Sequence, residues 1–536
     1  MTSEIEVPVL IVGGSLVGMT SALLLGHHGV KSLAVEYHRG TAIHPRAAQC
    51  TQRTLEIFRE VGIERPVCER SAEQFVQDGG IVAVETLAGG LTQHFIADLN
   101  AGVRDVSPCE RVFLSQNALE PMLKQRAEEL GARFVFATEV TGIEQNADGV
   151  VARLRHRDSG AETRVRARYA IAADGAHSRM RQGLAVGMRG HPTFSRSVTI
   201  YFRANLRKFL EREKWAVVYV NNDRLRGFFR FEKPFDSGFL VVSTTGDAAH
   251  PNVDVSSTLT NERAVELVQL ALGSRDIAVS VDNVMNWNAT AEWSEKMQRG
   301  HVFIAGDAAH VMPPTGGFGG NTGVVDAHNL AWKLAFVLSG RAAPALLETY
   351  EPERTPVAEY TCEQAYTRYV LRTDPTLGMA NTQKPVGELN IELGHIYRSP
   401  AIVTEEPDDG AQHVNPRESF GRPGTRAPHL WLTRAGERVS TLDLFGKRFV
   451  LLGGADSAAW CEAATAAGAA RGLQIDTWRA GEAGLVDAEN QLARAYGIEA
   501  SGAVLVRPDG VVAWRARSGA GASAAVLQRV LRQILG

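Results

Sequence analysis

The sequence of 536 residues has few cysteines and no cysteine motif. The five cysteines are odd in number, widely scattered and never spaced as Cys-x-x-Cys: Cys50, Cys68, Cys109, Cys362 and Cys461. This distribution predicts neither a disulfide framework nor a zinc site, and we expect no metal. It is typical of a reducing compartment, so we expect a cytoplasmic protein.

Excess charge of one sign is also missing. Lys and Arg number 57 and Asp and Glu number 60, which gives a formal net charge of −3. That balance offers no electrostatic footprint for nucleic acid or for an anionic membrane. Hydrophobic residues make up 44% and charged residues 22%, which excludes a disordered or fibrous chain. We therefore expect a small-molecule partner, and the composition leaves a homo-oligomer open.

One apolar run, residues 7–25, has the length of a membrane span or a signal peptide. Glu4 and Glu6 precede it, no Lys or Arg does, and three glycines interrupt it. A buried strand at 9–12, a turn, and a helix at 19–27 explain the run better. A second strand at 31–35 completes a βαβ unit, which indicates a parallel sheet.

The turn of this unit carries the first chemical motif. Bare backbone there lets a dinucleotide pyrophosphate approach the amides of a helix N-terminus. Glu36, at the end of the next strand, is placed to bind ribose hydroxyls. Ser15 stands where the usual pattern has glycine, and an ordinary glycine turn is the alternative interpretation. The residues of the turn are Gly13, Gly14, Ser15, Leu16, Val17 and Gly18.

The second motif follows an apolar strand at 164–173 and begins with Asp174 and Gly175. Taken alone, Asp-Gly after a strand indicates a simple turn as readily as a ligand site.

The third motif is the longest and runs from a strand at 301–305 to a helix at 326–338. The strand delivers Gly306 and the Asp307 carboxylate toward ligand hydroxyls. A glycine-rich stretch then opens a helix, whose N-terminal amides stabilise negative charge such as that on the pyrimidine ring of a reduced flavin. The residues assigned to this wall and amide cluster are Pro313, Pro314, Gly316, Gly317, Gly319, Gly320, Asn321 and Thr322.

Together the three motifs resemble the group A flavoprotein monooxygenases, which share the fold of para-hydroxybenzoate hydroxylase, over roughly residues 6–375. The resemblance implies FAD and NADPH or NADH as cofactors. It assigns Asp174, Gly175, Ser178 and Arg181 to both nucleotides and Asp307 to flavin hydroxyls. Two further stretches, 44–48 and 114–120, match the family and add Arg46 and Gln116 as cofactor contacts.

The sequence departs from the family at Gln49, where a glycine is common, which could alter the neighbourhood of the flavin. The tail, with stretches 421–429, 440–446 and 507–510, resembles that of the aromatic polyketide hydroxylases. Its order of strands and helices also resembles the thioredoxin fold, but Cys461 stands alone, so a working dithiol is excluded.

These observations predict an α/β protein in which a Rossmann-like FAD-binding domain contains an inserted antiparallel β-sheet for substrate and is followed by a thioredoxin-like domain. Short strands at 198–202, 216–220, 227–231 and 239–243 indicate the inserted sheet. The predicted divisions are 1–180 and 291–400 for the FAD-binding domain with a helical connection, 181–290 for the substrate sheet, and 401–536 for the linker and tail.

The function implied is hydroxylation of a polycyclic, polyketide-type aromatic by a flavin C4a-hydroperoxide formed from molecular oxygen, with NAD(P)H as reductant. The flavin supplies this chemistry, so no residue is assigned as a catalytic acid, base or nucleophile. Baeyer–Villiger oxygenation, or hydroxylation of a simple phenol, would share every cofactor motif. A flavin-loaded binding protein and a plain NAD-dependent dehydrogenase are further alternatives, and the latter leaves the third motif without a role.

Overall fold

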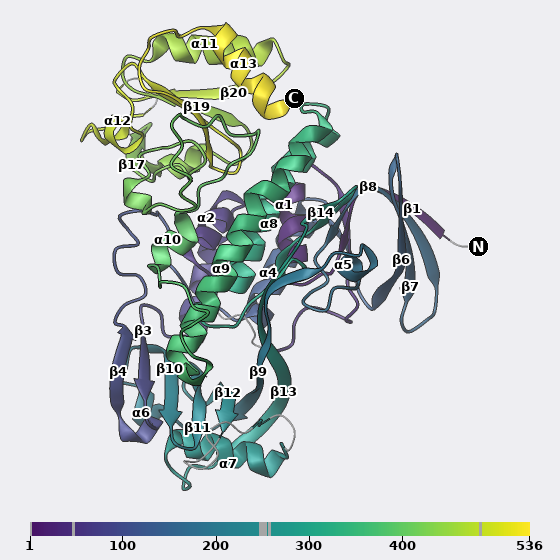
Figure 1. Ribbon diagram of the computed structural model, residues 1–536, viewed down its shortest axis with the longest axis vertical. Coiled ribbons are helices and arrows are strands. Elements are labelled where there is room, and N and C mark those ends of the chain that lie inside the picture. Colours follow the sequence, from purple (N-terminus) through teal and green to yellow (C-terminus); the bar gives the residue numbers. More distant parts are fainter. Residues whose placement is uncertain (1–2, 45–48, 246–253, 256–258, 482–484) are drawn as a thin grey trace.

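The computed structural model describes residues 3–44, 49–245, 254–255, 259–481 and 485–536. Figure 1 shows three parts: a central α/β part, a second sheet at its lower end, and the C-terminal region above it. The two longest helices, α8 (Phe318–Leu338) and α9 (Tyr350–Arg372), run through the middle, and α9 reaches down to the second sheet.

The first sheet is mainly parallel and confirms the predicted βαβ unit. Its central order is β14-β15-β8-β1-β2-β5, and a hairpin of β6 and β7 joins it at β8. Strand β1 pairs in parallel with both β2 and β8, so the carboxyl ends of three strands lie together. The bounds are β1 Ser3–Val12, β2 Ser32–Val35, β5 Arg133–Val135, β6 Thr138–Asn146, β7 Gly149–His156, β8 Glu162–Ala172, β14 Gln298–Arg299 and β15 Val302–Ile304.

Helices cover this sheet and close its core. The crossover helix α1 (Leu16–His27) packs against α8 and against α4 (Gln116–Glu129), and its middle residues are fully buried. Helix α8 begins at Phe318, eight residues before the predicted helix at 326–338. The sequence did not predict this earlier start, because Gly319 and Gly320 are weak helix formers. In the structure they form the first turn of the helix. The smaller helices are α2 Gln52–Glu60, α3 Glu64–Gln74, α5 Arg179–Gly183 and α10 Glu388–Leu393.

The second sheet contains all four strands predicted in the middle of the chain, in the order β16-β13-β9-β12-β11-β10-β3-β4. One face packs on helix α7 (Asn261–Leu272), with Leu240, Val242 and Leu267 in its core. The bounds are β3 Gly80–Val84, β4 Leu91–Ile96, β9 Met188–Arg203, β10 Trp215–Asn222, β11 Leu225–Glu232, β12 Ser237–Thr245, β13 Ser280–Ser294 and β16 His310–Val311.

This sheet differs from the prediction at one edge. Strands β3 and β4 come from residues 80–96, well outside the segment 181–290, and β3 pairs in parallel with β10. The sheet is therefore mixed rather than purely antiparallel. Pairing across more than a hundred residues leaves no local turn signal, which is why the sequence did not indicate it.

The C-terminal region has the predicted thioredoxin-like order, with a sheet β20-β19-β21-β22. Strands β19 and β20 are parallel and the others antiparallel, and helices α11 (Ala458–Ala469) and α13 (Ala524–Leu535) pack together on it. The bounds are β17 Trp431–Arg434, β18 Glu437–Ser440, β19 Phe449–Gly453, β20 Ile475–Arg479, α12 Gln491–Ala495, β21 Ala503–Val506 and β22 Val512–Ala516.

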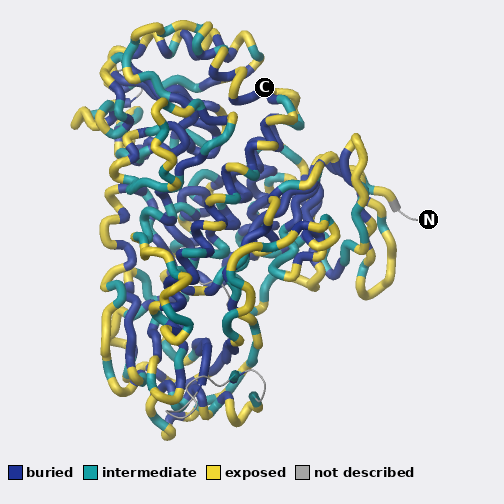
Figure 2. Tube along the Cα trace, viewed as in Figure 1, coloured by how far each residue is buried: buried dark blue, intermediate teal, exposed yellow. Residues whose placement is uncertain are grey.

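Figure 2 shows buried residues in all three parts of the molecule, so each part has its own core. Burial gathers along α8, which contacts the first sheet on one side and the C-terminal region on the other through Trp332 and Phe449. None of the helices in the described part of the chain combines the length and apolarity needed to cross a membrane.

Cys461 lies half-buried on α11, and burial raises the pKa of its thiol, which disfavours the reactive thiolate. We expect Cys461→Ser to leave turnover within about twofold, because a raised pKa keeps the sulfur unreactive. Product formation in the reaction that the resemblance implies measures turnover, with flavin content and the unfolding midpoint as controls. A large loss of product at unchanged FAD content would show that the thiol takes part in the chemistry.

Candidate functional site

The glycine turn after β1 has the geometry of a dinucleotide-binding turn. Gly13 adopts φ +103° and donates its N–H to the carbonyl of Val35 at 2.8 Å. A Cβ atom at Gly13 would overlap the carbonyl of Ala173, and one at Gly18 would overlap the carbonyl of Gly13. Glycine is therefore required at both positions. The amides in the first turn of α1, as at any helix N-terminus, have no acceptor within the helix.

Ser15 explains how the turn departs from the usual glycine pattern. Its φ of −99° lies in the extended region, so the backbone there does not need glycine. The Ser15 Oγ donates to Glu120 Oε1 at 2.5 Å and accepts from Gln116 Nε2 at 2.7 Å. Glu120 also accepts from the N–H of Ala42 at 2.6 Å. The start of α4 thus lies beside the turn and brings the predicted contact Gln116 to it.

Glu36 is buried at the carboxyl end of β2 and faces the same turn. Its Oε2 accepts from the N–H of Gly14 at 2.6 Å, and its Oε1 accepts from the N–H of His38 at 2.8 Å. Each carboxylate oxygen retains a second lone pair, the kind of acceptor that a ribose hydroxyl uses. Arg46, predicted to contact the cofactor, lies outside the described residues.

The second motif caps helix α5 and contacts the third. Asp174 accepts from Ser178 Oγ at 2.5 Å and from the N–H of Met180 at 3.0 Å. Arg181 donates from Nη1 to the carbonyl of Ala308 at 2.8 Å, so it ties the Asp-Gly turn to the Gly-Asp turn. Gly175 adopts φ +83°, which explains the glycine there.

The third motif meets the first at Gly306. Gly306 adopts φ +60°, and a Cβ atom there would lie 2.6 Å from Val17 Cγ2 in the first turn of α1. Asp307 follows in a short 3-10 turn, Gly306–Ala308, and its side chain is exposed. The predicted cofactor residues at Gly13, Val17, Glu36 and Asp307 therefore lie around the carboxyl edge of one parallel sheet.

A buried carboxylate holds this Gly-Asp turn. Asp326 on α8 accepts from the N–H of Gly306 at 3.0 Å, from His310 Nε2 at 2.7 Å and from Arg354 Nε at 2.7 Å. Burial opposes ionisation of Asp326, but Arg354 and His310 outweigh it and lower its pKa to about 2. His310 is therefore a partner of Asp326. In the described ranges, no group of three or more His, Cys, Asp or Glu could hold a metal ion.

The amide cluster forms at the N-terminus of α8. Gly316 and Gly317 adopt φ +98° and +67°, and the N–H of Gly317 donates to the carbonyl of Pro314 at 3.0 Å. The Asn321 side chain is occupied within the protein, because its Nδ2 donates to the carbonyls of Gln49 and Gly317. Thr322 Oγ1 donates to the carbonyl of Phe318. A role for Asn321 and Thr322 at the cofactor would therefore use their backbone.

The second sheet presents an aromatic face, which His44 contacts. Tyr201, Phe239 and Val241 are buried there, with Phe228, Met285 and Trp287 packed on them. His44 stacks on Tyr201 at 5.3 Å between ring centroids. Five residues on, Gln49 reaches Gly317, since a Cβ atom there would lie 2.7 Å from Gln49 Oε1.

A buried phenol lies on this same face beside a guanidinium. Burial raises the pKa of Tyr219 on β10, while the adjacent Arg372 on α9 opposes the rise. Arg372 also lies beside Glu388 and over the ring of Phe95. No spacing in the sequence indicates the pairing of Tyr219 with Arg372, which the long helix α9 brings to the sheet.

The residues present fit FAD. At the glycine positions of the turn, a side chain would overlap neighbouring backbone, so the backbone there is bare. The amides at the start of α1 face a site for pyrophosphate. Glu36 and Asp307 offer carboxylates to the hydroxyls of the nucleotide. Together with the parallel sheet, this site defines a dinucleotide-binding flavoprotein.

Comparisons with known proteins agree. Residues 6–365 match the model of the FAD binding domain, and residues 421–536 match that of the aromatic-ring hydroxylase C-terminal domain. The chain is 50% identical to 4-methyl-5-nitrocatechol 5-monooxygenase of Burkholderia sp, over 99% of this chain and 98% of that one. It is 37% identical to aklavinone 12-hydroxylase of Streptomyces purpurascens, over 99% of each chain.

The solved structure of aklavinone-11 hydroxylase with FAD and aklavinone superposes on 99% of each chain with a TM-score of 0.93 and 37% identity. The chain therefore belongs to the family of FAD-dependent aromatic-ring hydroxylases.

Asp307 gives a direct test of the site. Replacing Asp307 with Ala should raise the FAD dissociation constant by about tenfold to a hundredfold, because a charged hydrogen bond contributes roughly 1.5–3 kcal/mol. Asp307→Asn keeps an acceptor oxygen and should lose less. Ultrafiltration of diluted holoenzyme, with flavin absorbance read in the filtrate, measures both. Equal FAD retention by Asp307→Ala and the parent chain would remove Asp307 from the cofactor site.

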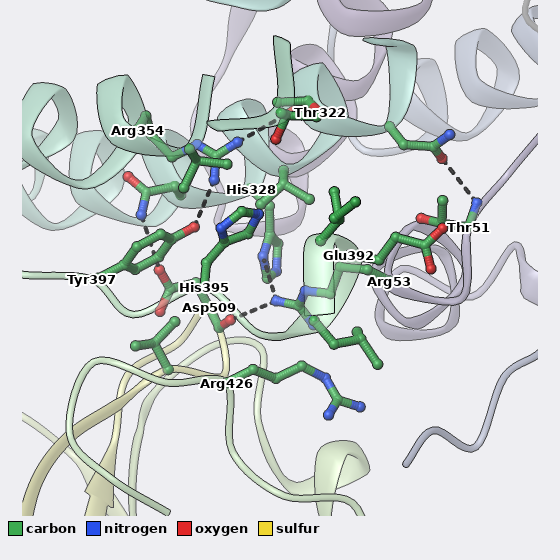
Figure 3. A pocket seen from close by; sticks show the side chains of 18 of the residues that line it. Thr51, Arg53, Thr322, His328, Arg354, Glu392, His395, Tyr397, Arg426 and Asp509 are labelled. Carbon is green, nitrogen blue, oxygen red and sulfur yellow. Dashed lines mark hydrogen bonds between the residues drawn. The ribbon is translucent and has the colours of Figure 1, made fainter. Parts of the chain in front are cut away.

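A separate cavity of about 60 Å³ lies between α8, α9, α10 and the C-terminal region (Figure 3). Arg53, Arg354, Arg426 and Asp509 line it together with Thr51 and Thr322. His395 also lines it. Burial, with Arg354 and His413 nearby, lowers the pKa of His395 to about 3. The imidazole is therefore neutral at physiological pH.

His395 should make the protein sensitive to mild acid. In the unfolded chain its pKa returns to about 6.5, so between pH 6.5 and 3 only the unfolded state binds the proton. Stability must then fall as pH falls through that window. His395→Gln should reduce the pH dependence of the free energy of unfolding by about 1.4 kcal/mol per pH unit in that window. Urea unfolding between pH 4 and pH 7 measures it, with His94→Gln on exposed β4 as control. Parallel pH profiles for parent and His395→Gln would refute this role.

Proposed function

We propose that this chain uses FAD and NAD(P)H to hydroxylate a phenolic ring of a polycyclic aromatic compound. The overall reaction consumes the aromatic, O₂, NAD(P)H and a proton, and it yields the phenol, water and NAD(P)⁺. FAD, when bound, supplies the reduction and the oxygen activation. The observation that carries the proposal is the aromatic sheet face around Tyr201 and Phe239, on which His44 stacks, while Gln49 lies against Gly317 at the start of α8.

The protein's own part is to bind, orient and shield. The aromatic face around Tyr201 and Phe239 offers an apolar wall for a flat ring. Amides at the N-terminus of α8, after Pro313 and Pro314, favour negative charge on a bound ring. The Tyr219 hydroxyl beside Arg372 suits a hydrogen bond to a substrate phenol, because the cation stabilises an oxyanion there. These contacts hold the substrate ring in a fixed position at the site, and a filled site excludes water.

A single-ring substrate is the second candidate, and a specific observation favours it. The relative that is 50% identical over nearly the whole chain is named for a nitrocatechol, a single ring, whereas the relative named for aklavinone is 37% identical. A larger ring system buries more apolar area, at about 25 cal/mol per Å². The aromatic sheet face suits either size.

The ratio of hydroxylated product to NADPH consumed decides between them. We expect a ratio near one for tri- and tetracyclic phenols and mostly hydrogen peroxide with single-ring phenols, because a poorly held ring leaves the activated oxygen to decay. Peroxide is measured in parallel with catalase. A higher ratio for 4-methyl-5-nitrocatechol or other single-ring catechols would replace the polycyclic assignment with the second candidate. A lactone or ester product would instead indicate Baeyer–Villiger oxygenation.

A further inference from the structure

Three charged residues of the C-terminal region reach into helices of the FAD-binding part. Arg426 donates from Nε to Glu56 Oε2 at 2.9 Å, and Arg507 donates from Nη1 to Glu353 Oε1 at 2.7 Å. Arg59 donates from Nε to Asp443 Oδ1 at 2.6 Å. Each C-terminal partner belongs to one of the three tail motifs that the cofactor chemistry leaves without a role. Those motifs therefore form an interface.

Two of the three pairs hold the same helix, α2. Glu56 is buried, and besides Arg426 it accepts from Arg53 Nη1 at 2.9 Å and from Ser107 Oγ at 2.6 Å. Burial opposes its ionisation, but Arg426 and then Arg53 outweigh burial and lower the pKa of Glu56 to about 2. The carboxylate is thus charged, and it is fully paired only while the C-terminal region is docked.

The N-terminal end of α2 is bonded to the first turn of α8. Thr51 caps the helix, and its N–H donates to Asn321 Oδ1 at 2.9 Å; Thr54 Oγ1 donates to the same oxygen at 2.6 Å. Asn321 Nδ2 in turn donates to the carbonyl of Gln49 at 3.0 Å. A shift of α2 would therefore move Gln49 and the first turn of α8, where the amide cluster lies.

We propose that the C-terminal region, by holding α2, positions Gln49 and the first turn of α8 at the cofactor site, and that Arg426 is the positioning residue. Figure 3 shows Arg426 and Asp509 on one side of the cavity and Thr51 and Thr322 on the other, with Arg53 between them. Arg53 strengthens the connection, since its Nη2 donates to the carbonyl of Asp509 at 2.9 Å. This inference rests on FAD binding alone and is independent of the substrate proposed above.

Arg426→Gln tests it against a matched control. Arg426 makes two bonds to Glu56 and one to the carbonyl of Val106; Arg515 makes two bonds to Glu405 and others to backbone carbonyls, all inside residues 401–536. Arg426→Gln and Arg515→Gln therefore each remove a two-bond ion pair, although Glu405 is 31% exposed and Glu56 is 3% exposed. Only the first variant removes a contact that holds α2.

The readouts are the FAD dissociation constant of the holoenzyme, by ultrafiltration, and hydrogen exchange over residues 52–60. We expect Arg426→Gln to raise the FAD dissociation constant about tenfold and to speed exchange in α2 by a similar factor. Arg426→Lys, which keeps the charge, should restore both to within about threefold. Arg515→Gln should leave both within twofold of the parent, even where its thermal midpoint falls.

Two results would overturn the proposal: unchanged FAD affinity and α2 exchange in Arg426→Gln, or equal losses in Arg515→Gln. Should Arg426→Gln not fold, Asp443→Asn weakens the second pair to α2, with Arg59, and its Oδ atom still accepts from the N–H of Ser440. That variant is then expected to speed exchange in α2 and weaken FAD binding, and parent-like behaviour would count against the proposal.

Discussion

Alanine in place of Gly13 is expected to yield protein that purifies without flavin colour. The backbone at Gly13 lies at φ +103°, and the added Cβ would overlap the carbonyl of Ala173, which directly follows the adjacent strand β8. The turn can accept alanine only by moving away from that strand, which displaces the amides that face the pyrophosphate. We expect FAD affinity to fall more than a hundredfold, about 2.8 kcal/mol or more.

The matched control for this prediction is Gly183→Ala, because Gly183 ends helix α5 and a Cβ atom there meets nothing within 4 Å. Its FAD content should equal that of the parent chain. Full flavin content in the Gly13→Ala protein would show that the turn does not form the dinucleotide site.

Removal of Arg507 should produce the largest loss of stability. Arg507 is fully buried and donates to Glu353 at 2.7 and 2.9 Å and to Asp509 Oδ2 at 2.5 Å. Lys333 Nζ donates to the same Glu353 at 2.9 Å. Arg507→Met leaves two buried carboxylates with one cation, which typically costs about 3–5 kcal/mol.

Charge balance, rather than lost packing, should account for that cost. The double variant with Arg507→Met and Asp509→Asn keeps Lys333 paired with Glu353 and removes one charge of each sign. It should therefore be more stable than Arg507→Met alone. Urea unfolding followed by tryptophan fluorescence measures both variants. A double variant less stable than either single variant would contradict this explanation.

The sequence predicted those parts of the site that depend on local backbone chemistry. A bare turn between strand and helix requires glycine wherever it bends with φ > 0, so Gly13 and Gly306 could be recognised from their neighbours. The strand order of the thioredoxin-like region also follows from local periodicity. Ser15 looked like a departure, yet its extended backbone needs no glycine.

What the sequence could not predict depends on contacts between distant segments. Strand β3 joins β10 across more than a hundred residues. Arg354 reaches Asp326 from α9, where the sequence predicted only a helical connection without bounds. Contacts between residues far apart in the chain produce no characteristic spacing in the sequence. The same holds for Arg426 and Glu56, 370 residues apart, whose motif was visible but whose partner was not.

We infer that this chain inserts an atom of molecular oxygen into an aromatic ring with FAD as its cofactor. Turnover of the purified holoenzyme with NADPH, a phenolic polycycle and isotopically labelled O₂, analysed by mass spectrometry, tests it most directly. Oxygen insertion from O₂ predicts one labelled oxygen per hydroxylated product, and none when the label is in water instead. Label entering the product from water, or NADPH consumption without any oxygenated aromatic for polycyclic and single-ring phenols alike, would contradict it.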